Sequence, residues 1–367
     1  MATLEECGKQ AGYANNASAV PFTLPWRSRI YALAGLSLLL LVVVVFFTTL
    51  GSVRIPFSTC AGVLLSSLPA CPIDSSYPDT IEMIVLSIRL PRIVLAGLVG
   101  AGLAVAGATY QGLFRNPLAD PYLLGVASGA GLGATVGFLL PFTAAWLTFG
   151  AVPLLAFIGG MGAVSVVYFL ARVGKSVPGT TLILAGVALG AFLSSITSYL
   201  FTIAGEKLHG IVFWLLGGLS LTRWEEVAVV LPAVLIGAAV IWLHSRPLNV
   251  MQLDEEQAQQ LGVNVERVKL TLLAAATLIT SAAVCFTGLI GFVGIIVPHA
   301  VRLIWGPDHR FLLPLSTVVG ALFLILADTV AHSLLPPTEI PVGVITAFCG
   351  APFFLYLLRR RREVSLL

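Results

Sequence analysis

Long apolar runs constrain the fold of this chain more than any other feature of its sequence. The runs 30–50, 228–243 and 311–330 each approach the roughly 20 apolar residues that an α-helix needs to cross a bilayer core. Of the 367 residues, 58% are hydrophobic and 10% are charged, whereas soluble proteins carry about 25% charged residues. A single soluble core cannot bury so many runs. The sequence therefore predicts an all-α integral membrane protein.

About ten membrane-spanning helices are predicted. They cover residues 30–50, 91–111, 122–140, 148–171, 180–203, 226–244, 268–289, 291–305, 311–332 and 341–358. The eighth is short and rich in glycine, so totals of nine or eleven stay open. The expected organisation is an N-terminal segment 1–29, one ten-helix domain 30–358 and a basic tail 359–367. The N-terminal residues lack the charged, apolar and cleavage regions of a signal peptide, so no removable leader is expected.

Lysine and arginine residues set the expected orientation. With the N-terminus in the cytoplasm, 15 of the 20 basic residues fall on cytoplasmic segments and 5 fall outside. The five outside are Arg54, Arg89, Arg92, Lys207 and Arg223. This division agrees with the positive-inside rule and with an even number of spans. Both termini are therefore predicted to be cytoplasmic.

The segment 114–121 joins two spans on the predicted cytoplasmic side. Its two prolines and Asp120 predict a rigid turn in which Pro121 starts the next helix. Such a turn can simply connect two helices. If it lines a pore instead, Asn116 and Leu118 are the side chains placed to narrow the pore.

The longest predicted cytoplasmic loop, 249–269, contains a candidate docking helix. Residues 251–263 predict a short helix that ends at Gly262. One face carries Leu253, Gln257, Ala258 and Leu261. The first turn carries Asp254, Glu255 and Glu256, which interact favourably with the helix dipole. This pattern favours contact with a cytoplasmic protein, and a solvated connector is the alternative.

Charged groups at the outer side and inside the spans are few. Arg89 and Arg92 break the positive-inside trend immediately before the second span. Headgroup contact is the ordinary interpretation, but two guanidiniums at an outer mouth would also suit the carboxylates of an arriving partner. Asp328 and His299 are the main ionisable groups within apolar runs. A structural hydrogen bond is expected for each, rather than a proton relay.

Cysteine usage and catalytic patterns give little sign of metal or enzyme chemistry. Five scattered cysteines form no CxxC pair, so no metal site is expected. Cys60 and Cys71 share a predicted outer loop, where a disulfide and two free thiols are equally open. The run 174–176 imitates the end of a phosphate-binding loop, but Phe169 stands where that loop needs glycine. The sequence therefore predicts no enzyme, no cofactor bound by this chain and no nucleic-acid partner.

Several short blocks, taken together and in order, resemble the permease subunits of the vitamin B12, ferric-siderophore and haem ABC importers. The resemblance covers about residues 30–358. The blocks are 89–92, 107–111, 114–121, 124–126, 184–189, 213–218, 253–263, 291–294, 298–299 with Arg302, 308–310, 327–328, 339–343 and 350–352. No single block is decisive, but their joint order is specific.

This resemblance implies a type II ABC importer permease in a prokaryotic inner membrane. It implies a homodimer with a path along the two-fold axis, two ATPase subunits that use ATP and magnesium, and an extracytoplasmic substrate-binding protein. By position, the ATPase-coupling residues are Leu253, Asp254, Glu255, Glu256, Ala258, Leu261, Gly262 and Val263. The gate residues are Asn116, Leu118, Gly179 and Thr180, and the docking residues are Arg89, Arg92 and His332.

His332 stands where some relatives have a third docking arginine. Protonated histidine can pair with a carboxylate, so docking is expected to weaken as pH rises. A docking affinity that does not change between about pH 5.5 and about pH 8 would contradict this. An ion-coupled secondary transporter is the chief alternative function, and a membrane enzyme is a distant third. Ferric siderophore is slightly favoured as cargo, with cobalamin close behind and haem also open.

Overall fold

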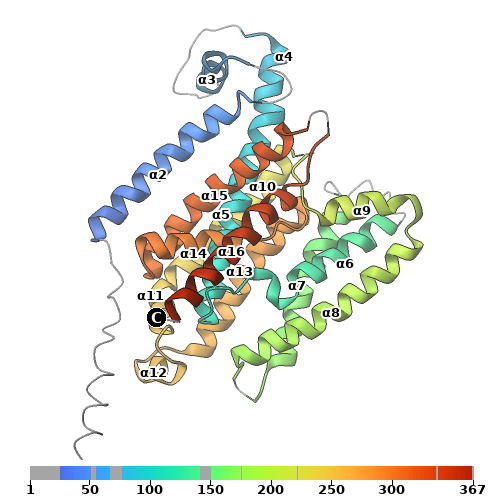
Figure 1. Ribbon diagram of the computed structural model, residues 1–367. Coiled ribbons are helices and arrows are strands. Elements are labelled where there is room, and N and C mark those ends of the chain that lie inside the picture. The colour runs from blue at the N-terminus through green and yellow to red at the C-terminus, as the bar shows by residue number, and fades with distance from the viewer. Residues whose placement is uncertain are drawn as a thin grey trace, which may run out of the picture.

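The computed structural model describes residues 25–50, 55–66, 77–140, 150–174, 176–220, 222–335 and 338–365 (Figure 1). Nearly all of these residues are helical, and within them the only β-type pairing is an isolated bridge between Val173 and Ser176. The predicted all-α class is confirmed. Arg54, Cys71 and Lys175, which entered the sequence argument, lie outside the described residues.

Seven helices of the described part are long and apolar enough to cross a membrane. They are Trp26–Phe47 (α2), Asp79–Leu113 (α4, η1 and α5), Ala151–Ala171 (α7), Gly179–Ile203 (α8), Trp224–Leu243 (α10), Val265–Thr287 (α13) and His309–Ser333 (α15). The other three predicted spans correspond to shorter apolar stretches: Val126–Leu139 (α6), Val293–Trp305 (α14) and Val342–Leu355, the apolar part of helix Val342–Ser365 (α16). Each predicted span therefore has a helix.

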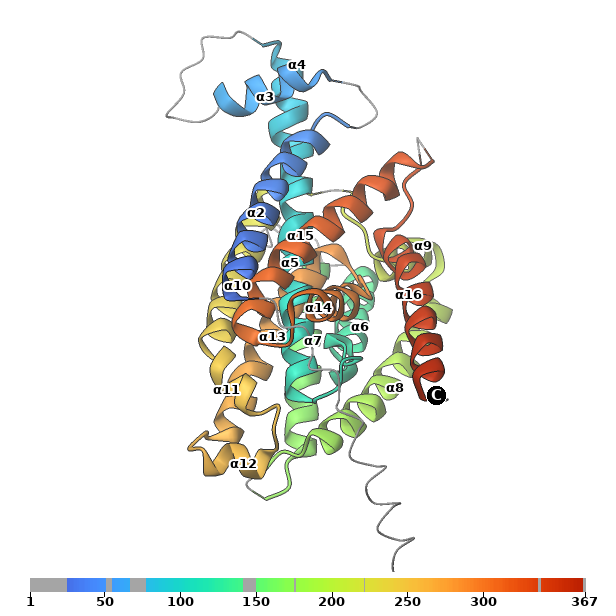
Figure 2. The same cartoon turned by 60° about the vertical axis from the view of Figure 1, so that its left-hand side comes forward.

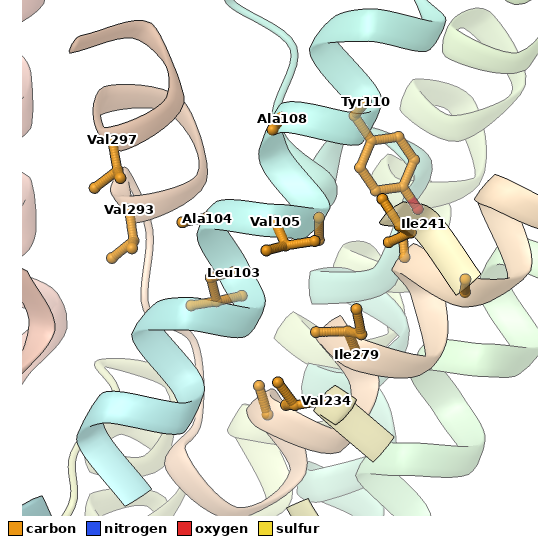
Figure 3. Packing of buried hydrophobic residues seen from close by; sticks show 14 of the residues in the cluster. Leu103, Ala104, Val105, Ala108, Tyr110, Val234, Ile241, Ile279, Val293 and Val297 are labelled. Atoms are coloured by element: carbon orange, nitrogen blue, oxygen red, sulfur yellow. The ribbon is translucent and has the colours of Figure 1, made fainter. Parts of the chain in front are cut away.

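Helix α5, Leu90–Leu113, runs through the centre of the bundle (Figures 1 and 2). It packs against α15, α13, α14 and α10, and 83% of its most apolar stretch is buried. Figure 3 shows Tyr110, on α5, close to Ile241, on α10. The Tyr110 hydroxyl lies 3.1 Å from Thr277 Oγ1 on α13, so the polar end of this buried ring is satisfied within the protein.

The second span begins earlier than predicted. Short helix α4, Asp79–Glu82, continues as the π-helix η1, Met83–Arg89, into α5. Pro91 has no N–H to donate and interrupts the α-helical ladder. In the turn before it, the N–H of Leu90 donates to Val85 O, five residues back, as in a π-helix. The prediction placed the boundary at the proline, whereas the chain changes its winding and continues.

Helices α6 and α7 make the most extensive helix–helix contact among the described residues, and glycines lie in it. A Cβ atom on Gly129 would collide with the carbonyl oxygen of Gly159, and one on Gly133 would collide with that of Leu155. The four-residue spacing of these glycines is typical of such an approach. Gly125 differs from them, because its φ of 82° separates the 3-10 helix Pro121–Leu124 (η2) from α6. Regular α-helix therefore starts later than residue 122.

Helix α2 and a small cluster at the end opposite α12 lie at the periphery of the bundle. None of the most apolar stretch of α2 is buried, and the helix lies against α15. Helix α3, Phe57–Ser66, carries Cys60, a buried free thiol whose Sγ donates to Thr48 O at 3.6 Å. The pairing of this cysteine with Cys71 therefore stays a prediction without support from the structure.

The remaining elements are short connectors. They are Gly205–Lys207 (η3), Leu208–Leu215 (α9), Ser245–Val250 (α11) and Glu255–Gln260 (α12). The start of α2 and the end of α16 lie towards the same end of the bundle as α12 (Figure 1). This arrangement agrees with an even number of spans and with both termini on the cytoplasmic side.

Candidate functional site

Residues 114–121, here called the gate turn, leave α5 at its predicted cytoplasmic end. Asn116 Oδ1 accepts a hydrogen bond from the N–H of Leu118, and the N–H of Ala119 donates to Asn116 O, both at 3.0 Å. Arg115 has a φ of 50°, which is costly for a residue with a side chain. Leu118 is 48% exposed. Asn116 thus shapes the turn, and Leu118 is its exposed apolar group.

The second predicted gate element, Gly179 and Thr180, forms the start of α8. A Cβ atom on Gly179 would lie 3.3 Å from Phe114 Cδ1, so α8 begins directly against the first residue of the gate turn. Phe114 stacks on Tyr110 with ring centroids 6.0 Å apart. Thr180, like Leu118, is exposed. The structure therefore brings both predicted gate elements together within one subunit.

A hollow of about 490 Å³ opens beside the gate turn, between α8 and the starts of α6 and α14. Asp120, Ser128 and the glycines Gly186 and Gly190 are among its lining residues. Burial raises the pKa of the Asp120 carboxyl to about 6, and the hydrogen bond from the N–H of Tyr122, 2.7 Å long, opposes this rise only partly. The wall of the hollow is thus mostly apolar, with one carboxyl that is reluctant to ionise.

Residues 251–263, here called the coupling segment, contain a shorter helix than predicted. Helix α12 covers only Glu255–Gln260, because Asp254 caps it by accepting a hydrogen bond from the N–H of Glu255 at 2.9 Å. Gly262, with a φ of 84°, lies just past its end. The predicted face divides, since Ala258 is fully buried while Leu253 and Leu261 are 57% and 65% exposed. The exposed surface therefore combines apolar and acidic groups.

One connection joins the coupling segment to the gate turn. Arg115 Nη1 donates to Asp254 Oδ1 and to Leu253 O, both at 3.0 Å. One turn earlier, Gln252 Nε2 donates to Gly112 O at 2.9 Å. Arg115, just past α5, therefore contacts the cap residue of α12, and Gln252 of the coupling segment contacts the last turn of α5.

A second connection joins the coupling segment to the start of α8. Lys269 is 4% exposed, and its Nζ donates to Glu255 Oε2 at 2.7 Å, Glu266 Oε1 at 3.4 Å and Val177 O at 3.2 Å. Glu266 Oε2 accepts from the N–H of Val177 at 3.0 Å. Val177 precedes Gly179 by two residues. The start of α12 is thus connected to both predicted gate elements.

Sequence reasoning missed Arg115, Glu266 and Lys269 as residues of this site. In the sequence argument, Arg115 and Lys269 were counted only among the cytoplasmic basic residues. Glu266 and Lys269 lie three residues apart at the start of α13, which is a recognisable local pair. The contacts with Glu255 and Val177 depend on how α12, α13 and α8 pack, and no local pattern indicates them.

At the opposite end, Arg92 lies in a cluster of charged side chains. Arg92 Nε and Nη2 donate to Asp328 Oδ2 and Oδ1 at 2.8 and 2.9 Å. Nη1 and Nη2 donate to Glu339 Oε1 and Oε2 at 2.9 and 3.1 Å, and Ser220 Oγ donates to Glu339 Oε2 at 2.8 Å. The structural hydrogen bond expected for Asp328 is confirmed as a bidentate pair with arginine.

The other two predicted docking residues occupy different surroundings. His332 Nδ1 lies 2.8 Å from Asp328 O and 3.9 Å from Asp328 Oδ2, so His332 borders the Arg92 cluster. Arg89 Nη1 donates to Thr48 O at 2.7 Å, just past the end of α2. The structure therefore brings Arg92 and His332 together and directs Arg89 towards α2. Docking by these residues stays a prediction.

Comparison with known proteins adds a separate line of support. Residues 38–360 match the FecCD transport family. The chain is 49% identical to the cobalamin import system permease protein BtuC of Halobacterium salinarum, over 81% of this chain and 79% of that one. It is 40% identical to the hemin transport system permease protein HmuU of Yersinia pestis, over 79% and 87% of the two chains.

A solved structure agrees with the sequence relatives. An inward-facing metal-chelate type ABC transporter superposes with a TM-score of 0.77 at 32% identity, covering 89% of this chain and 98% of that one. The matched family segment spans all but the ends of the described bundle, and the type II ABC importer fold is confirmed. The chain belongs to the FecCD transport family.

Proposed function

We propose that this chain is the membrane-spanning permease subunit of an ATP-driven importer for a metal-chelate compound. A substrate-binding protein delivers the cargo, which is cobalamin, haem or a ferric siderophore. One observation carries the proposal: the coupling segment is joined to the gate turn by Arg115 and to the start of α8 by Lys269. An importer needs such a path between an energy source in the cytoplasm and a gate.

Two cytoplasmic ATPase subunits are the proposed partners of the coupling segment. Leu253 and Leu261 offer exposed apolar contacts, and Asp254 and Glu256 offer charges between them. The ATPases bind ATP and magnesium, so this chain needs no nucleotide site and is a transport subunit rather than an enzyme. Closure of the ATPases would move α12, and the two side-chain connections would carry this motion to both gate elements.

A second copy of the chain completes the proposed path. Helix α8 is poorly covered, with only 17% of its most apolar stretch buried, although it carries one of the gate elements. Leu184, Val187, Phe192 and Tyr199 are all more than half exposed on it. Thr180 at its start is exposed as well. A homodimer in a prokaryotic cytoplasmic membrane would cover part of this surface and place two gates face to face.

The rival function, an ion-coupled secondary transporter, has less support from the residues. Such a carrier commonly uses unpaired acidic groups within its spans. Asp328, an acidic residue within a described span, already forms a bidentate pair with Arg92. In this alternative the coupling segment would also have no partner to contact.

Reconstitution tests the proposal directly. The chain is placed in proteoliposomes with its ATPase and binding protein, identified by co-purification, and cargo uptake is followed with cobalamin, haemin and a ferric siderophore. Cobalamin is tested first, because the relative named for it is 49% identical, against 40% for the haemin relative. Uptake that requires ATP and loaded binding protein supports the proposal. Uptake driven by an ion gradient without an ATPase contradicts it.

A further inference from the structure

The guanidinium of Arg92 is almost fully engaged inside the protein. Four hydrogen bonds of 2.8–3.1 Å join it to Asp328 and Glu339, and these use four of the five N–H donors of arginine. A carboxylate arriving from outside cannot bind Arg92 through two bonds while both internal carboxylates stay in place.

The two carboxylates differ in access to solvent. The Asp328 side chain is 4% exposed and is carried by α15, packed against α5. The Glu339 side chain is 32% exposed and lies in the connector between α15 and α16. Burial by itself raises the pKa of the Glu339 carboxyl, but the hydrogen bonds and charge of Arg92 outweigh this and hold it below its usual value. Glu339 is thus ionised, and it is the more accessible of the two carboxylates.

The net charge of the Arg92 cluster disfavours binding of an acidic partner while Glu339 remains paired with Arg92. One guanidinium faces two carboxylates, so the group is net negative whenever His332 is neutral. A further carboxylate would be repelled, whereas replacing Glu339 by a partner's carboxylate leaves the charge unchanged.

We propose that Glu339 pairs with Arg92 while no partner is bound, and that an acidic side chain of the docking substrate-binding protein then takes its place on Arg92. The inference rests on the proposed function, since it requires such a partner. Asp328 stays in place during the exchange and orients the guanidinium from its buried side.

The exchange would also change contacts at the ends of two helices of the bundle, α10 and α16. Glu339 accepts a hydrogen bond from Ser220, which lies ahead of α10, and it precedes α16 by three residues. The N–H of Ile340 donates to Ala331 O at 3.2 Å, which ties the connector to α15 independently of Glu339. Release of Glu339 would therefore free Ser220 and the approach to α16 without detaching the connector.

The test is the affinity of the purified binding protein for the permease–ATPase complex in nanodiscs. Glu339→Gln keeps the shape and removes the competing charge, so we expect binding about tenfold tighter. Glu206→Gln is the matched control, because Glu206 is an exposed acid at the predicted outer end of α8. The control should bind as the parent does. Ser220→Ala, which removes the hydrogen bond that holds Glu339, should tighten binding by a smaller factor.

A double-mutant cycle shows whether the effect passes through Arg92. In an Arg92→Ala background, Glu339→Gln should change the affinity by less than about twofold. Parent-like or weaker binding by both Glu339→Gln and Ser220→Ala overturns the exchange and makes Glu339 a residue that positions Arg92. A parent complex that binds no binding protein at all contradicts the proposed function, and the exchange fails with it. The two failures are therefore distinguishable.

Discussion

Lys269 Nζ lies 2.7 Å from Glu255 Oε2 and 3.2 Å from Val177 O, so one buried ammonium joins α12 to the segment that starts α8. Burying an ammonium is costly unless it is paired and hydrogen-bonded, and Lys269 meets both conditions. Lys269 is therefore a direct side-chain link between the coupling segment and the start of α8.

Replacement of Lys269 should uncouple hydrolysis from transport. In Lys269→Gln the contact with Glu255 loses its charge, so we expect cargo moved per ATP hydrolysed to fall about fivefold. Uptake and phosphate release are measured together in proteoliposomes. Arg267→Gln, an exposed cation two residues earlier, is the matched control and should keep the parental ratio. Equal losses of uptake and hydrolysis in Lys269→Gln would indicate damage to the assembly rather than uncoupling.

The Arg115–Asp254 contact should matter for transport and little for stability. Both side chains are substantially exposed, 42% and 52%, and such pairs contribute little to stability because water screens their charges. Asp254→Asn keeps a capping oxygen for α12 but removes the charge. We expect a nearly unchanged unfolding temperature and an uptake rate about threefold lower. A stability loss as large as the transport loss would mean that the cap, rather than the link to the gate turn, is what the substitution removes.

The Asp120 carboxyl should make the stability of the permease depend on pH. Its pKa is raised from 3.8 to about 6, mainly by burial, so the folded state holds the proton more tightly than the unfolded state. This contribution to stability is complete below about pH 4 and is lost as pH rises through about 6. Asp120→Asn, which can still accept from the N–H of Tyr122, should therefore be the more stable protein at neutral pH, by at most about 3 kcal/mol.

Thermal unfolding in detergent across this pH range measures the effect. The advantage of Asp120→Asn over the parent should disappear on acidification to about pH 4. If Asp120→Asn is less stable than the parent at neutral pH, the protein stabilises the ionised carboxylate of Asp120, and the prediction is wrong.

Two glycines on adjacent helices offer a matched test of the α6–α7 contact. A Cβ atom on Gly129 would collide with the carbonyl oxygen of Gly159, whereas nothing lies within 4 Å of one on Gly162. Gly129→Ala should therefore destabilise the protein by about 1–3 kcal/mol. Gly162→Ala should be neutral or slightly stabilising, because alanine is favoured over glycine in a helix by about 1 kcal/mol. Unfolding temperatures of the two variants provide the comparison, and equal values would contradict the packing described.

The sequence alone determined the helical class, the ten apolar segments and the shared side of the two termini. These features depend on composition, on the length of apolar runs and on the placement of basic residues, all of which are local or additive properties. It also located the gate turn and the coupling segment, because proline, capping aspartate and glycine act on their immediate neighbours. The boundaries it missed, at Pro91 and at Gly125, lie where helix winding changes without ending.

Only the tertiary structure decided what the charged side chains contact. Arg92 pairs with residues 236 and 247 positions away, and Lys269 donates to a carbonyl 92 positions away. Such partners are set by which helices pack together and by the rotation of each helix about its axis. A residue on an apolar span can face lipid, a neighbouring helix or the outer opening of the transport path, and the hydrophobic pattern of the span is the same in each case. The sequence could therefore identify Arg92 as a charge at the outer mouth, and only the packing of α5, α15 and the α16 connector showed that two carboxylates already hold it.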